Sequence, residues 1–268
     1  MRALVDYSRS NATASHLIAV PFVTLVLIYQ DRGAIFSSIR FAPLSGAGLV
    51  LVGLGLSFGG RLATGSGPLE GALGVLVAGL VISWVGGFLL LFGRDAVRAA
   101  IFPLLFLAFT IPIPEPLIAG ATQVLKSGST ETVAGLFTLT GTPYHRVGFV
   151  FSLPMFAIEV ADACSGIRST IALLLTGLLA GHMFLRESWT KACVVAAILP
   201  VTILKNGIRI VTLSMLAMHV DPEFLTGQLH HEGGIVFFVL GLVILAPVLA
   251  VLRKSETRIR QATAVPLS

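Results

Sequence analysis

The chain has 268 residues, of which 55% are hydrophobic and only 12% are charged, and its mean hydropathy is +0.93. Such a sequence is too apolar to bury its side chains in one water-soluble core, which excludes a soluble enzyme or binding domain. The net charge of +5 is explained by the basic cytoplasmic loops of a membrane protein, so nucleic acid is not an expected partner.

Apolar runs long enough to cross a bilayer, which takes about 20 residues, recur along the whole chain. They lie near 14–30, 42–59, 69–93, 98–117, 165–185, 192–218 and 232–252. We therefore expect an all-α polytopic membrane protein with about seven transmembrane helices, and an eighth stays open. The glycine-rich second run looks weaker than the others, and the fourth ends in a proline-rich segment that cannot continue as a regular helix. No cleavable signal peptide is evident, so we expect the first helix to direct insertion.

The basic residues give the orientation. Ten lie in one set of loops if the first helix runs inward: Arg32, Arg40, Arg94, Arg98, Arg186, Lys191, Arg253, Lys254, Arg258 and Arg260. Five lie in the opposite set: Arg2, Arg9, Arg61, Lys126 and Arg146. Because cytoplasmic loops are enriched in Lys and Arg, we expect the N-terminus outside and the C-terminus inside.

This orientation places the long connection 118–163 outside the membrane. Its first part repeats apolar residues at the spacing of an interfacial amphipathic helix: Leu117, Ala121, Val124, Leu125, Val133, Leu136 and Phe137. The part after Gly141 alternates apolar with smaller or polar residues, which predicts one or two short strands. We expect one membrane domain over 1–268, with a small extracytoplasmic cap at 118–163.

Cys164 lies where the polar outer loop turns into the fifth apolar run. A helix N-terminus and nearby cations lower the pKa of a thiol, and the thiolate is the reactive form. We therefore consider Cys164 a candidate nucleophile. Arg168, one helical turn further on, either stabilises the thiolate or pairs with Glu159 or Asp162.

The second cysteine, Cys193, lies at the inner end of the next predicted helix. It is therefore too far from Cys164 for a disulfide. No Cys or His spacing in the chain resembles a zinc cluster. We expect no metal and no cofactor.

Arg209 lies in the sixth run, on the helical face that also carries Asn206 and Lys205. Ionisable residues within spans are costly and are therefore candidates for function. At about 1.5 Å a residue, Arg209 lies roughly 27 Å from Lys191 and near the outer surface, at the level of Cys164. The alternative is that both cations only extend to the interface or bind lipid headgroups.

His230 and His231 precede the seventh run at its outer end. Loop histidines are often only solvated, but here the following helix would direct an imidazole toward the layer of Cys164 and Arg209. A histidine can take the proton of a thiol and return it to a leaving amine. An arginine can bind a developing oxyanion.

Three motifs resemble those of the exosortase/archaeosortase family of membrane cysteine transpeptidases. They are Ala163-Cys-Ser-Gly-Ile-Arg-Ser169, Asn206-Gly-Ile-Arg-Ile210 and His231-Glu-Gly-Gly-Ile-Val-Phe-Phe238. The resemblance covers most of the chain from about 14 to 240. It implies that Cys164, Arg209 and His231 are catalytic. The supporting residues would be Glu159, Ser165, Arg168, Asn206 and His230.

The resemblance further implies cleavage of exported, membrane-anchored proteins near a C-terminal sorting signal of the PEP-CTERM type. Such a signal consists of a recognition motif, a transmembrane helix and a basic tail. An acyl-enzyme on Cys164 would pass its acyl group to an acceptor amine, for which a lipid is one option, or to water. The expected location is a bacterial inner membrane, with the site on the extracytoplasmic side. Some relatives carry arginine where this chain has His231.

Two other kinds of protein remain as alternatives. A transporter or channel could use Lys205, Asn206 and Arg209 to hold an anionic solute. It would need a continuous polar path near the midplane, whereas these residues gather near one surface. A non-catalytic scaffold for envelope assembly would not need Cys164.

Overall fold

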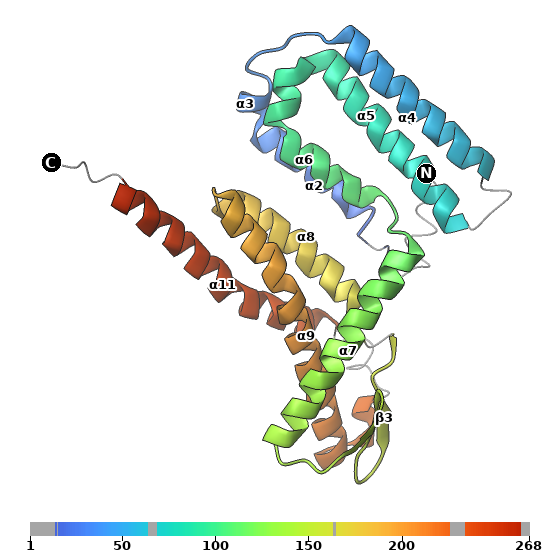
Figure 1. Cartoon of the computed structure of the whole chain (residues 1–268), viewed down its shortest axis with the longest axis vertical. Helices are drawn as coiled ribbons and strands as arrows, with labels where there is room; N and C mark the ends of the chain where they lie inside the picture. The colour runs from blue at the N-terminus through green and yellow to red at the C-terminus, as the bar shows by residue number, and fades with distance from the viewer. Residues whose placement is uncertain (1–13, 15, 64–68, 163–164, 226–233, 264–268) are drawn as a thin grey trace. The chain divides into compact units, whose positions relative to one another are not determined.

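The computed structural model describes residues 14, 16–63, 69–162, 165–225 and 234–263. Most of these residues are helical (Figure 1). The chain forms two compact units, one from 1 to 118 and one from 119 to 268. Each unit has buried apolar clusters of its own.

A close antiparallel hairpin of α4 (Pro43–Ala63) and α5 (Leu69–Ala99) dominates the first unit (Figure 1). Small residues recur every seven positions on the two facing surfaces: Gly46, Gly53 and Gly60 on α4, and Ala72, Gly79 and Gly86 on α5. A Cβ atom at Gly53 would lie 2.5 Å from Ser83 N and 2.6 Å from Gly79 O. Only glycine therefore permits this approach of the two backbones, and close packing of this kind holds helices together in lipid.

The α5 helix is interrupted at Gly93, which has φ 84° and ψ −178°. The extended segment before α4 lies against this break, since Arg40 N donates to Phe92 O at 3.4 Å and Ala42 N donates to Leu90 O at 3.3 Å. A Cβ atom at Gly93 would overlap Arg40 O. The positive φ and the close contact both require glycine here, at the position where the third apolar run was predicted to end.

Short helices complete the first unit: α2 (Ala19–Gln30), α3 (Arg32–Ile35), α6 (Ile101–Phe106) and the 3₁₀ helix η2 (Leu107–Thr110). They pack with α5 around a cluster of six buried side chains: Ile28, Ile35, Phe88, Ala96, Ala100 and Leu104. The rings of Phe36, Phe88 and Phe92 extend this core in tilted and edge-to-face contacts. The apolar first and fourth runs thus form short, broken helices rather than long ones.

Five helices of the described chain are long and apolar enough to cross a membrane: Pro43–Ala63, Gly71–Ala99, Ile167–Phe184, Ser188–His219 and Gly234–Ile259. A sixth is reached if 101–110 and 115–139 are counted together as one broken span. The multi-pass helical class is as predicted, but the predicted count of seven or eight is not confirmed. The first run gives a helix of only 12 described residues, and prolines at 112 and 114 end the fourth.

The second unit contains most of α7 (Glu115–Leu139), followed by β1 (His145–Val147), β2 (Val150–Ser152) and β3 (Ala157–Glu159). The strands form one antiparallel sheet in the order β1-β2-β3, where one or two strands were predicted. Phe151 of β2 lies opposite Ile158 of β3 and packs with Phe137 of α7 in a shared core. Arg146 donates twice to Glu131, at 3.1 and 2.7 Å, which also raises the pKa of Arg146.

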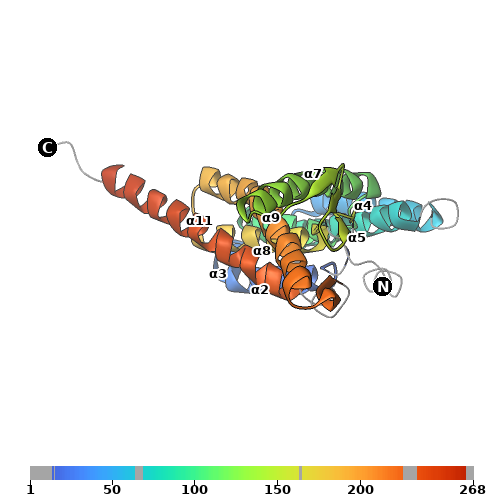
Figure 2. The same ribbon diagram turned by 90° about the horizontal axis from the view of Figure 1, so that it is seen from below.

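Three long helices form the rest of the second unit and lie together in both views: α8 (Ile167–Phe184), α9 (Ser188–His219) and α11 (Gly234–Thr263) (Figures 1 and 2). The short 3₁₀ helix η4 (Pro222–Leu225) follows α9. The common core of α8, α9 and α11 consists of Leu173, Ile198, Val201 and Leu245. The α7 helix packs on α9 where glycines make room, because a Cβ atom at Gly207 would lie 2.8 Å from that of Thr132.

Candidate functional site

A polar cluster is buried where α9 meets α7 and α8. The Lys205 side chain, 3% exposed, donates a short hydrogen bond to Ser169 Oγ of α8. Asn206 is fully buried and donates from Nδ2 to Ser129 Oγ of α7 at 3.0 Å. Burying an amine and an amide is unfavourable unless both are hydrogen-bonded, so the serines are part of what makes this cluster tolerable.

The turn before α8 rests directly on this cluster. Gly166 has φ 77°, and a Cβ atom there would lie 3.2 Å from Asn206 Oδ1 and 3.5 Å from Ser169 Oγ. The Gly166 carbonyl accepts hydrogen bonds from the hydroxyls of Ser169 and Thr170, both at 2.9 Å. Ser165 is fully buried, and its hydroxyl has no hydrogen-bond partner within the described part of the chain. The turn is therefore fixed in a conformation that suits glycine.

The other end of the same segment is attached to α7. Lys126 Nζ lies 3.0 Å from Asp162 Oδ1 and 4.5 Å from the centre of the Phe149 ring. The Lys126 side chain is 12% exposed, whereas that of Asp162 is 73% exposed. Residues 162 and 169 are thus each joined to a neighbouring helix through a lysine, Asp162 to α7 and Ser169 to α9.

Arg209 lies one helical turn beyond Lys205 on α9 and is half-buried. Its guanidinium carbon lies 5.9 Å from the centre of the Phe237 ring on α11. A guanidinium over an aromatic face is attracted by the electrons of the ring. The arginine is therefore positioned at the start of α11, close to the polar cluster.

The comparisons with known proteins identify the family of the chain. A family model described as transmembrane exosortase matches residues 8–247, which is most of the chain and includes every element of the polar cluster. The chain belongs to the transmembrane exosortase family. Neither the search of curated proteins nor that of solved structures found a match.

The predicted site residues of this exosortase divide into two groups. Cys164, His230 and His231 lie outside the described residues. Arg209, Asn206 and Ser165 lie in or beside the polar cluster. The structure describes the residues on either side of Cys164 in the chain, and the roles of the three catalytic candidates stay predictions.

The remaining predicted residues, Arg168 and Glu159, are exposed. Arg168 lies in the first turn of α8 and Glu159 lies on β3, where it pairs with Val150. Among the described residues Arg168 forms no ion pair with Glu159 or Asp162, and Asp162 is paired with Lys126 instead. Of its two predicted roles, pairing with a carboxylate is thus not observed.

Lys126, Ser129 and Ser169 contact the site but were not identified from the sequence as site residues. Lys126 and Ser129 are three residues apart on α7, whose sequence drew attention for its apolar face rather than its polar one. Ser169 is the last residue of the cysteine motif, and its place in that motif could have identified it as a site residue. No group of three His, Cys, Asp or Glu side chains that could hold a metal occurs in the described segments.

Proposed function

We propose that this exosortase cleaves membrane-anchored substrate proteins at a C-terminal sorting signal of the PEP-CTERM type. The Cys164 thiolate attacks the scissile carbonyl, a thioester forms, and the peptide C–N bond breaks. His231 takes the thiol proton and gives it to the leaving amine, while Arg209 binds the oxyanion. An acceptor amine or water then attacks the thioester, which releases the product and restores the thiol.

The observation that supports this proposal best is the attachment of the cysteine-bearing segment at both ends. Asp162 is bound by Lys126 of α7, and Ser169 is bound by Lys205 of α9. Cys164 lies between these two residues in the chain and one peptide bond before the buried Ser165. A nucleophile must be held in line with its target bond, because small displacements reduce the rate strongly.

A second observation concerns the charge near that segment. Lys205 and Arg209 lie one turn apart on α9, and Lys205 is bonded to a hydroxyl rather than to a carboxylate in the described chain. Positive charge beside a cysteine can stabilise a thiolate and, later, an oxyanion. We propose that the site opens to the extracytoplasmic face of a bacterial inner membrane. The same charges would serve the alternative role of an anion transporter, for which Cys164 would be expendable.

The deciding experiment is co-expression with a substrate that carries a recognition motif, a transmembrane helix and a basic tail. We expect Cys164→Ser to abolish processing, and Cys193→Ser to leave it unchanged because that cysteine lies exposed on α9. Mass spectrometry of the protein trapped during turnover should find the substrate acyl group on the peptide that contains Cys164. Normal processing by Cys164→Ser, at equal protein level, would contradict the nucleophile assignment.

A further inference from the structure

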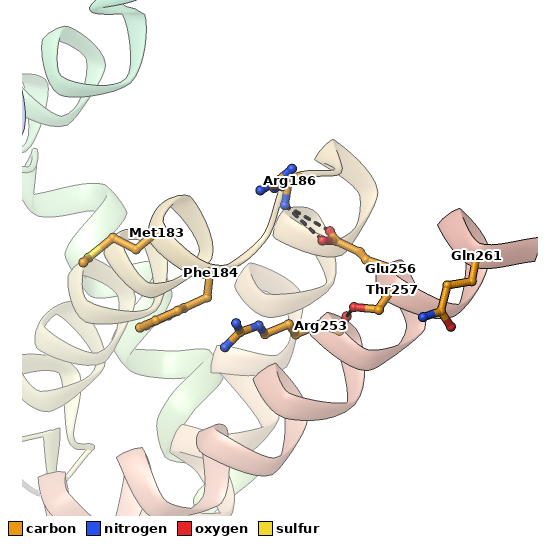
Figure 3. Close-up of a pocket in the computed structure, with 7 residues that line it drawn as sticks. All are labelled: Met183, Phe184, Arg186, Arg253, Glu256, Thr257 and Gln261. Atoms are coloured by element: carbon orange, nitrogen blue, oxygen red, sulfur yellow. Dashed lines mark hydrogen bonds between the residues drawn. The ribbon is translucent and has the colours of Figure 1, made fainter. Parts of the chain in front are cut away.

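A cavity of about 550 Å³ lies between the end of α8 and the last turns of α11, remote in sequence from the cysteine motif. Its lining combines two arginines, a carboxylate, two neutral polar side chains and two apolar ones: Met183, Phe184, Arg186, Arg253, Glu256, Thr257 and Gln261 (Figure 3). The α8 span ends at Phe184 and the candidate α11 span ends at Ile259. The cavity is therefore at the level where both helices leave the apolar layer.

The carboxylate in this cavity is already occupied. Glu256, 7% exposed, accepts hydrogen bonds from Arg186 N at 3.2 and 3.1 Å (Figure 3). It also accepts one from Glu187 N at 2.9 Å and one from the Thr190 hydroxyl. These donors belong to the turn between α8 and α9 and to the first turn of α9. A carboxylate at a helix N-terminus is favourable, so Glu256 fastens α11 to that turn.

The two guanidinium groups have no such partner. Arg186 and Arg253 are exposed, and in the part of the chain that the structure describes neither forms an ion pair. Arg253 lies over the Phe184 ring, 5.9 Å from its centre, which restrains the guanidinium without using its N–H donors. The two guanidinium groups outnumber the one carboxylate of the cavity, and Glu256 is held by the turn between α8 and α9, so the cavity carries net positive charge beside the Gln261 amide.

We propose that this cavity binds the phosphate group of an anionic phospholipid. Guanidinium groups bind phosphate oxygens in pairs through parallel N–H donors, and the Gln261 amide supplies a further donor. Met183 and Phe184 are 59% and 47% exposed and offer an apolar surface for the first part of the acyl chains. Free phosphate would satisfy the arginines but not that apolar surface, and a basic peptide would be repelled by both arginines.

The position of Trp189 indicates that the cavity lies at the depth of the lipid headgroups. It lies in the first turn of α9, 47% exposed, one residue before the Thr190 that binds Glu256. Exposed tryptophans are enriched at the level of the lipid headgroups. The phosphate of a bound lipid and the two arginines would therefore meet at the same depth.

The test uses the full-length protein in detergent, with phosphatidylglycerol or phosphatidylcholine added and lipid adducts counted by native mass spectrometry. We expect wild type to retain phosphatidylglycerol in preference to phosphatidylcholine. The double variant Arg186→Gln with Arg253→Gln should retain it at least about tenfold less. Lys254→Gln is the matched control, because this neighbouring exposed cation does not line the cavity.

Inorganic phosphate at millimolar concentration should not displace the lipid, and displacement would identify a free anion as the ligand and contradict the proposal. Equal retention by the double variant and wild type would also contradict it, as would an equal loss in Lys254→Gln. If the double variant does not fold, Arg253→Gln alone, with a thermal midpoint equal to wild type, provides the same comparison. The proposal does not depend on the peptide cleavage proposed above.

Discussion

Lys205 is the residue whose surroundings matter most for the site. A primary amine within a membrane span is costly, and at 3% exposure it cannot reach water or a headgroup. Its hydrogen bond to Ser169 therefore both satisfies the amine and ties α8 to α9. This excludes the alternative that Lys205 merely extends to the interface, which the sequence left open.

We expect Ser169→Ala to reduce substrate processing by roughly tenfold or more. The variant leaves a buried amine without its acceptor, a loss that costs about 1–3 kcal/mol and loosens the segment that begins at Cys164. A structural defect alone would lower the protein level, so the discriminating measurement is the rate at which Cys164 is alkylated by a maleimide as the pH is varied. That profile should shift in Ser169→Ala, in a Cys193→Ser background.

Ser214→Ala is the control for this prediction. Ser214 is also buried on α9, but its hydroxyl donates to Ile210 O of its own helix at 2.8 Å, and no hydrogen bond joins it to another of the described elements. We expect near-normal processing and an unchanged alkylation profile. If both serine variants behave alike, the link between Ser169 and Lys205 does not position the cysteine.

The polar residues show how far the sequence predicts such a site. Lys205, Asn206 and Arg209 were found because a charge or an amide stands out in an apolar run. Ser129 and Ser169 were not found, because a hydroxyl in a membrane helix is common and usually bonds to its own backbone. Only the fold reveals that these two hydroxyls accept hydrogen bonds from side chains of another helix.

At the scale of elements, the hairpin of α4 and α5 depends on glycine. The second apolar run looked weak because glycine lowers helix propensity in water. In the structure its glycines face α5 at intervals of seven residues and let the two backbones touch. The glycine content that weakened the prediction of this helix is thus what allows α4 to pack closely on α5, because packing in lipid favours small residues.

We expect Gly53→Leu to destabilise the first unit by roughly 1–3 kcal/mol or more, since its side chain would meet backbone atoms of α5 at 2.5–2.6 Å. Gly55→Leu is the matched control, because a Cβ atom at Gly55 has no neighbour within 4 Å. The measurement is the thermal midpoint of the detergent-solubilised protein, followed by the loss of its monodisperse peak on gel filtration. If the two variants have the same thermal midpoint, the packing of the α4 glycines on α5 does not stabilise the hairpin.

At the scale of the whole molecule, hydropathy predicted the class of protein but not the number of spans. Hydropathy reflects how many apolar residues a run contains, and it does not show where the hydrogen bonding of the backbone is interrupted. Prolines at 112 and 114 divide one run, and the described helix of another is 12 residues long. The three later runs became long helices, although α9 begins at 188 rather than 192 and α11 ends at 263 rather than 252.

The orientation of the chain is a separate prediction, because it depends on the distribution of basic residues rather than on the helices. We expect Ser152→Cys, exposed on β2, to react with a membrane-impermeant maleimide in intact cells. Lys254→Cys, exposed near the end of α11, should react only after permeabilisation, because the basic residues around position 254 predict that this end of α11 is cytoplasmic. Both variants are made in a background in which Cys164 and Cys193 are replaced by serine. The reverse labelling pattern would place the strands in the cytoplasm, where a sorting enzyme could not act on exported proteins.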